Sequence, residues 1–204
     1  MKLYGLWMLI ALITADKRPG KPIVSVTFIG KKITDEGLQH IEPLTSLEGV
    51  DLIGTSVTDA GLVHLKGRTN LKHLNLHNTK VTDAGLEHLK GLTNLEVLYL
   101  HSTGVTDAGL VHLEGLSKLT WLNLQYTEVG DAGLEHLKGL TSLVRLGLSA
   151  QVTNTGLEHL EGMTGLRFLG LRGTDVTDEG VKKLQQALPN CRIDRVFGMI
   201  PLSL

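Results

Sequence analysis

The stretch 71–91 reads LKHLNLHNTKVTDAGLEHLKG, and versions of it recur along the whole chain. Its most regular part is a glycine in the phrase TDAGL or a close variant, which returns every 24 residues with a single step of 23. The glycines that mark this period are Gly37, Gly61, Gly85, Gly109, Gly133, Gly156 and Gly180. A constant period of this length predicts stacked copies of one small structural unit.

The first half of each unit has the pattern of a short strand. Leu74 and Leu76 alternate with polar residues, which predicts a strand with one buried face. One unit cannot bury its leucines alone, so its neighbours must cover them. We therefore expect seven units to stack over residues 23–190, with their strands forming one parallel sheet.

The second half of each unit has the pattern of a short helix. Thr82 lies where a helix N-cap is expected, and Asp83 places negative charge in the first turn. Leu86 and Leu89 are three residues apart and share one helical face, which we expect to face the core. Gly91 is expected to end the helix.

With this period and leucine spacing, the chain resembles the bacterial leucine-rich repeat proteins built from LTxLxxLxLxxTxVTDAGLxHLxG. It is similar to the cysteine-containing class of the ribonuclease-inhibitor-like superfamily. The resemblance implies an α/β leucine-rich repeat solenoid: a right-handed βα horseshoe with a parallel sheet on the concave face and short helices on the convex face. It is specific for fold and not for function. Threonine takes the place of that class's cysteine at Thr55, Thr79, Thr103, Thr127 and Thr174.

The two ends of the chain leave alternatives open. Residues 1–15, MKLYGLWMLIALITA, have the charged start, apolar run and small final residue of a signal peptide. Residues 1–22 could equally form an N-terminal cap and lead-in to the repeats. A signal peptide would place the protein in the cell envelope or outside the cell, and its absence would place it in the cytoplasm. We expect residues 191–204 to form a C-terminal cap strand and tail.

Composition narrows the range of functions. The net charge of −1 gives no basic excess for nucleic acid, and Cys191, the single cysteine, excludes an intramolecular disulfide. No HExxH motif, phosphate-binding glycine loop or set of nucleophile and base is present. We expect no enzymatic activity, no cofactor and no metal. We also expect no membrane span and a monomeric chain.

Two polar columns follow the repeat on the helical side. One contains His40, His64, His88, His112, His136 and His159, and the other contains Asp35, Asp59, Asp83, Asp107, Asp131 and Asp178. We interpret the histidines as a solvated convex face and the aspartates as helix-start acids. The GGxGxD pattern of calcium-binding repeats is absent.

Three positions interrupt the pattern. Arg68 replaces an apolar residue, so its side chain must reach solvent or distort its turn. Gly130 replaces a capping threonine, a loss of about 1 kcal/mol. A deletion leaves Ala150 and Gln151 where the threonine column should continue.

The strand residues that should point away from the core vary from unit to unit. A fixed framework with a varied face is typical of a binding scaffold. Tryptophan, tyrosine and arginine, which are enriched in interface hot spots, occur among these residues. The candidate partner-binding residues are His73, Asn75, His77, Tyr99, His101, Trp121, Asn123, Gln125, Arg145, Phe168 and Arg172.

The sequence therefore predicts a non-enzymatic scaffold for protein–protein interaction, with a protein partner on the concave sheet. The alternative is an extracytoplasmic surface or adhesion module that binds protein or glycan. His77 and His101 occupy equivalent positions in neighbouring units, just after their strands. Two ligands are fewer than zinc usually requires.

Overall fold

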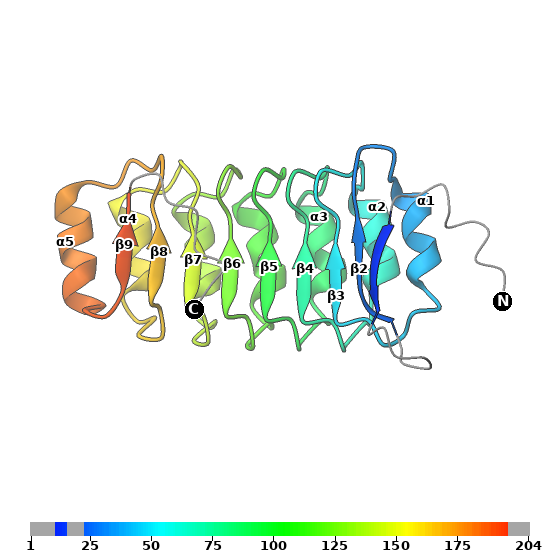
Figure 1. Cartoon of the computed structure of the whole chain (residues 1–204). Helices are drawn as coiled ribbons and strands as arrows, with labels where there is room; N and C mark the ends of the chain where they lie inside the picture. The colour runs from blue at the N-terminus through cyan, green and yellow to red at the C-terminus, as the bar shows by residue number, and fades with distance from the viewer. Residues whose placement is uncertain (1–10, 16–22, 196–204) are drawn as a thin grey trace.

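The computed structural model describes residues 11–15 and 23–195 and shows a solenoid with one sheet in front of a layer of short helices (Figure 1). The sheet has nine strands in the order β1 to β9, so neighbours in sequence are neighbours in space. Strands β2 to β9 run parallel, and β1 pairs antiparallel with β2. The predicted leucine-rich repeat fold is confirmed. The strands are β1 (Ala11–Ala15), β2 (Ile23–Phe28), β3 (Gly49–Asp51), β4 (His73–Asn75), β5 (Val97–Tyr99), β6 (Trp121–Asn123), β7 (Arg145–Gly147), β8 (Phe168–Gly170) and β9 (Arg192–Asp194).

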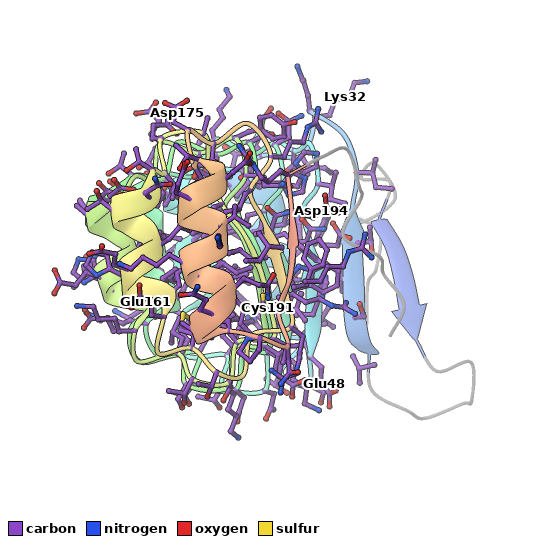
Figure 2. All side chains as sticks on the ribbon, turned by 90° about the vertical axis from the view of Figure 1, so that its left-hand side faces the viewer. Lys32, Glu48, Glu161, Asp175, Cys191 and Asp194 are labelled. Carbon is purple, nitrogen blue, oxygen red and sulfur yellow. The ribbon has the colours of Figure 1, made fainter. Side chains whose placement is uncertain are left out.

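The helices lie in a second layer behind the sheet, as the end-on view of Figure 2 shows. Most consist of one α-turn followed by one 3₁₀-turn, and two are 3₁₀ throughout. α5 is longer than the others, with ten residues. The helical segments are α1 (Asp35–Leu38), η2 (Gln39–Ile41), α2 (Asp59–Leu62), η3 (Val63–Leu65), α3 (Asp83–Leu86), η4 (Glu87–Leu89), η5 (Asp107–Leu113), η6 (Ala132–Leu137), α4 (Asn154–Leu157), η7 (Glu158–Leu160) and α5 (Asp178–Ala187).

The core is a continuous stack of leucines between the two layers. Leu74, Leu98 and Leu122 are strand partners of one another and are fully buried, as are the helical Leu86 and Leu89. Every unit contributes equivalent residues to the same cluster. Because each layer of side chains is covered only by its neighbours, the stack explains why the units are stable together and not singly.

The threonine column closes the turn after each strand. The Thr79 hydroxyl donates to the carbonyl of Leu76 at 2.8 Å, and the Thr103 hydroxyl donates to the carbonyl of Leu100 at 2.5 Å. Thr55, Thr127 and Thr174 repeat this bond. The threonine column therefore holds each of these turns through a hydrogen bond to the carbonyl three residues earlier.

The aspartates link neighbouring units, a role that our interpretation as helix-start acids lacked. Asp59 accepts from the backbone N–H of Thr82 through Oδ1 and from its hydroxyl through Oδ2, both at 2.7 Å. The same pair of hydrogen bonds joins Asp83 to Thr106, at 2.8 and 2.7 Å. Asp35 and Asp131 do the same for the units that follow them. We call this series the aspartate ladder.

The ladder also explains the repeated glycine. A Cβ on Gly85 would collide with Oδ1 of Asp59, the aspartate of the preceding unit. A Cβ on Gly109 would collide with Asp83 in the same way. The phrase TDAGL therefore contributes to two junctions. Its threonine donates to the aspartate of the preceding unit and its glycine leaves space for that aspartate, while its own aspartate accepts from the next unit.

Irregular units keep the ladder in altered form. Gly130 lacks a hydroxyl, so Asp107 retains only the backbone bond, at 2.6 Å. Asn154 replaces aspartate and both accepts from the Thr177 N–H and donates to its hydroxyl, each at 3.0 Å. In the last described unit, Asp178 pairs with Arg195.

Arg68 resolves its apolar position by hydrogen bonding. Its guanidinium donates to the carbonyls of His64, Leu44 and Ile41 at 2.8–2.9 Å, which satisfies backbone groups at two helix ends. The preceding Gly67 has a φ of +77°, so the turn is distorted as the sequence suggested. Gly91 has no positive φ, so a left-handed glycine does not end its helix, contrary to the role we expected for it.

A left-handed residue follows most strands by the same number of positions, a feature that the sequence analysis missed. Gly54 and Gly173 fill this position without strain, with φ of +64° and +78°. Asn78, Ser102 and Tyr126 adopt φ between 54° and 58° at the equivalent place. Tyrosine is unusual there because its Cβ crowds the backbone.

Candidate functional site

The strand register brings the candidate residues together on the concave face. His73, Val97, Trp121, Arg145 and Phe168 are successive Cα partners from β4 to β8. A second row, displaced by two residues along the strands, pairs Asn75 with Tyr99 and Tyr99 with Asn123. The two rows lie side by side, as the alternation of the leucines implied.

Tyr99 and Trp121 form the centre of an aromatic cluster. Their rings meet edge to face with centroids 5.0 Å apart. Tyr99 also lies edge-on to His73 at 5.6 Å and to His101 at 6.4 Å. The guanidinium of Arg145 lies over the Trp121 ring, 4.7 Å from its centroid. These contacts fix the rings in place, which lowers the entropy that a partner must overcome on binding.

Burial separates the candidates into two groups. Asn75 and Asn123 are only 8% and 7% exposed, and their side-chain oxygens accept from the backbone N–H two residues later. They therefore lie on the concave face and shape the strand ends, but they offer little surface to a partner. Phe168 is also largely buried, at 9%. His73, Tyr99, Trp121 and Arg145 are half-buried and remain accessible.

His77 and His101 stack face to face at the end of the aromatic cluster. Their ring centroids are 3.5 Å apart with an interplanar angle of 12°, and His77 Nδ1 lies 3.2 Å from the carbonyl oxygen of His101. Burial, with a smaller contribution from His77, lowers the pKa of His101 to about 4. Burial also lowers the pKa of His73, although nearby Asp51 opposes it. The imidazole rings of His101 and His73 are therefore uncharged at neutral pH.

Two strand positions beyond Asn123 and its equivalents, the side chains differ from unit to unit. Gln125 is half-buried, and Arg172 lies over the ring of Tyr126 with its guanidinium 5.8 Å from the centroid. At the position equivalent to Gln125 in the next unit, Ser149 is 1% exposed and its hydroxyl donates to the Val129 carbonyl. The deletion at Ala150 and Gln151 shortens this turn and draws Ser149 inward.

A hollow of about 440 Å³ adjoins the aromatic cluster where strands β6 to β9 begin. Its lining combines rings, aliphatic groups and three guanidiniums: Thr120, Trp121, Val144, Arg145, Arg167, Phe168 and Arg192. Arg167 and Arg192 were absent from our candidates. Arg167 precedes its strand and Arg192 lies in the cap, so the strand alternation gave no signal for either.

The helical side is less suited to a site. His64 and His136 each bond to a glutamate of the preceding unit, Glu42 and Glu114, at 2.7 and 2.6 Å. Within residues 11–15 and 23–195, no three His, Cys, Asp or Glu residues lie close enough to hold a metal ion. In that same part of the chain, no helix is both long and apolar enough to span a membrane.

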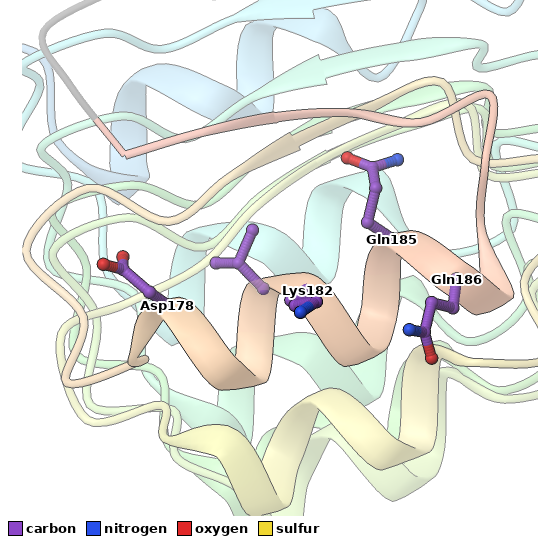
Figure 3. Close-up of a pocket in the computed structure, with 5 residues that line it drawn as sticks. Asp178, Lys182, Gln185 and Gln186 are labelled. Atoms are coloured by element: carbon purple, nitrogen blue, oxygen red, sulfur yellow. The ribbon is translucent and has the colours of Figure 1, made fainter.

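A second hollow, of about 460 Å³, lies on the outer surface of α5. Figure 3 shows Asp178, Lys182, Gln185 and Gln186 along this helix, with polar groups pointing in different directions. The lining has neither an aromatic ring nor a cluster of like charges. It is the surface on which a further unit would stack, and it lacks the convergent groups of a binding site.

Comparison with known proteins supports the repeat assignment. Leucine-rich repeat family models match residues 69–112, and residues 115–138 and 163–184. No curated protein is significantly similar in sequence to this chain.

Solved structures show the same fold. Internalin C2 from Listeria monocytogenes is 22% identical, with a TM-score of 0.59, over 85% of this chain and 81% of that chain. A chain of the PEPR1–AtPEP1 crystal structure is 22% identical, with a TM-score of 0.60, over 89% of this chain and 25% of that chain. At this level of identity the likeness concerns the fold alone.

Proposed function

We propose that this chain is a non-enzymatic scaffold that binds a protein partner on its concave sheet. The observation that carries the proposal is the cluster of Tyr99, Trp121 and Arg145, with a ring–ring distance of 5.0 Å and a guanidinium–ring distance of 4.7 Å. These residue types supply most of the binding energy in protein interfaces when they lie at the centre of a patch.

The surroundings of the cluster support a protein partner. The adjoining hollow gives an anchor side chain a place to enter, and Phe168 and Val144 provide apolar walls. The parallel sheet holds the patch rigidly, because each of its residues is registered against both neighbouring strands. A rigid patch with an anchor pocket favours specific binding over loose adsorption.

Site-specific photocrosslinking tests the proposal. A photoreactive amino acid in place of Val97, beside Trp121 on the concave face, should crosslink one partner in cells of the natural source. The same amino acid in place of His112, on the helical side, is the matched control. Equal crosslinking from both positions, or crosslinking from His112 alone, would contradict a concave interface.

The alternative, an extracytoplasmic surface module, is favoured by one feature of the same face. Aromatic rings such as Tyr99 and Trp121 can stack on sugars as well as on protein side chains. A glycan array with the purified chain separates the two functions. Binding to defined glycans that is lost in Trp121→Ala would favour the surface module.

Two finer assignments belong with this proposal. We place the chain among bacterial leucine-rich repeat proteins similar to the cysteine-containing, ribonuclease-inhibitor-like class, because threonine fills the cysteine position in the turn. We propose a monomer. Residues 1–10 of the predicted signal peptide, residues 16–22 of the predicted lead-in and residues 196–204 of the predicted tail lie outside the described residues. Mass spectrometry of the native N-terminus tests whether residues 1–15 are removed.

A further inference from the structure

The hollow beside Trp121 has an unusual combination of charge and shape. It lies across the first residues of β6 to β9, and its lining holds three arginines and no acidic residue. The chain as a whole carries 20 basic and 21 acidic residues, so this concentration of positive charge is local. The charge is therefore a property of this surface and points to a negatively charged occupant.

The three guanidiniums differ in how far the protein itself satisfies them. Arg145 makes no ion pair and no hydrogen bond within the described residues, and its visible partner is the Trp121 ring. Arg167 uses one nitrogen to donate to the carbonyls of Thr164 and Leu166 and pairs with no carboxylate of the described chain. Arg192, whose side chain is exposed, lies 3.5 Å from the half-buried Asp194. Arg145 therefore retains the most capacity for a carboxylate.

Part of the lining of the hollow is apolar. Trp121, Val144 and Phe168 line it, and the indole Nε1 of Trp121 is buried without a hydrogen-bond partner among the described residues. A volume of about 440 Å³ has room for one or two aliphatic side chains. An occupant that only carried negative charge would leave this surface uncovered.

The spacing of the strands sets the spacing of the occupant's charges. Arg145 begins β7 and Arg192 begins β9, with β8 between them. Two steps between parallel strands are roughly 10 Å. A peptide in the polyproline II conformation has three residues per turn and advances about 3.1 Å per residue, so carboxylates three residues apart lie on one face, about 9 Å apart, and would reach both arginines.

We propose that this hollow binds a peptide segment in the polyproline II conformation, with two acidic residues three positions apart and leucine-like side chains between them. The carboxylates pair with Arg145 and Arg192, Arg167 strengthens the field at the rim, and an apolar side chain packs against Trp121 and Phe168. This inference rests on the proposed function, because it names the chemistry of the partner at the same concave face.

The test is direct binding of a short probe to the full chain. The probe is Gly-Glu-Leu-Leu-Glu-Gly, amidated at its C-terminus and labelled with fluorescein at its N-terminus, in an anisotropy titration. Two matched probes replace both glutamates by glutamine or both leucines by serine. We expect each replacement to weaken binding about tenfold or more, which corresponds to about 1.4 kcal/mol. Raising the salt concentration from about 0.05 to about 0.5 M should also weaken it.

Protein variants locate the bound peptide. Arg145→Gln should weaken binding of the glutamate probe about tenfold while leaving the weak binding of the glutamine probe unchanged. Lys138→Gln, which removes an exposed cation from the helical side, should bind like the parent chain. Circular dichroism melts of both variants check that the fold is retained.

Several outcomes would overturn the inference. Equal affinity for the glutamate and glutamine probes, or equal losses in Arg145→Gln and Lys138→Gln, would show that the arginines do not select the peptide. Binding only after removal of residues 196–204 would assign the hollow to the chain's own segment. If crosslinking from Val97 still captures a partner while the probe fails to bind, the concave interface stands and this inference alone falls.

Discussion

The ladder junctions and the concave face use the same repeat in opposite ways. At the junctions, Asp59 and Asp83 make nearly identical pairs of bonds to the threonine of the next unit. On the concave face, the equivalent positions of neighbouring strands hold residues as different as Trp121 and Arg145. The difference teaches that repetition marks contacts between units, whereas variation marks surface free to acquire specificity. The following predictions test that division, in order of expected effect on free energy.

The largest effect should come from the core. Leu98→Ala should lower the free energy of unfolding by roughly 2–5 kcal/mol, because the fully buried side chain leaves a cavity between two units. Urea unfolding followed by circular dichroism measures it. The control, His112→Ala on the helical side, should stay within about 0.5 kcal/mol. A comparable loss for His112 would contradict our interpretation of the histidine column.

The ladder should come next. Asp83→Ala removes two acceptors from Thr106 and should lower the free energy of unfolding by about 1–3 kcal/mol. Asp107→Ala removes only the bond to Gly130 and should cost less. The same urea titration compares the two variants. If Asp107→Ala cost as much as Asp83→Ala, the threonine hydroxyl would contribute nothing to the junction.

On the concave face, a substitution should weaken binding and leave the stability of the fold almost unchanged. Trp121→Ala should reduce affinity for the crosslinked partner by about 2 kcal/mol, roughly thirtyfold, since a central ring is lost. The melting temperature should change little, because Trp121 lies outside the leucine core. Isothermal titration calorimetry measures the affinity, and a thermal melt measures the melting temperature. Collapse of the melt would identify Trp121 as part of the framework.

The histidine stack should couple stability to pH. The pKa of His101 is lower in the folded chain than in the unfolded chain, so the unfolded state gains the proton first as the pH falls. The contribution of His101 to the free energy of unfolding is fully present above about pH 6.5 and is lost as the pH falls from there to about 4. We expect a loss of about 1–2 kcal/mol, discounted for the ring's partial exposure. Unfolding titrations at several pH values measure it, and His101→Gln should flatten the profile.

The smallest effect should be a gain. Tyr126→Gly should raise the free energy of unfolding by about 1 kcal/mol, because glycine adopts the left-handed backbone that tyrosine adopts with strain. Asn78→Gly, at the equivalent turn, should gain less, since asparagine tolerates this conformation. Thermal melts of both variants give the comparison. A destabilised Tyr126→Gly would show that the ring, which is 60% exposed, contributes to the fold through Arg172.

The fold was predictable because its signal is repeated in every unit. Leu74 and Leu76 fix which strand residues are buried, and the 24-residue period fixes which residues of neighbouring units are partners. The aspartate ladder was not predictable in the same way. Asp59 and Thr82 are 23 residues apart, and an acid at a helix start already has a sufficient local explanation.

The candidate site was predictable in its centre and not at its edges. Tyr99, Trp121 and Arg145 follow from the strand alternation, and the structure brings them into contact. The burial of Asn75 depends on a local turn bond that the alternation does not encode. Arg192 lies beyond the last regular unit, where the period no longer gives a register.

The aspartate ladder has a direction, and this direction determines how units could be added to the chain. Each unit presents a threonine donor to the unit before it and an aspartate acceptor to the unit after it. A duplicated unit of 24 residues would therefore carry both the threonine donor and the aspartate acceptor, and it could be inserted between any two regular neighbours. The bonds of Asp35 to Thr58 open the series, and the ion pair of Asp178 with Arg195 substitutes for the next threonine where the regular units stop. Growth by insertion would leave these closing contacts intact and would add one new row to the concave surface.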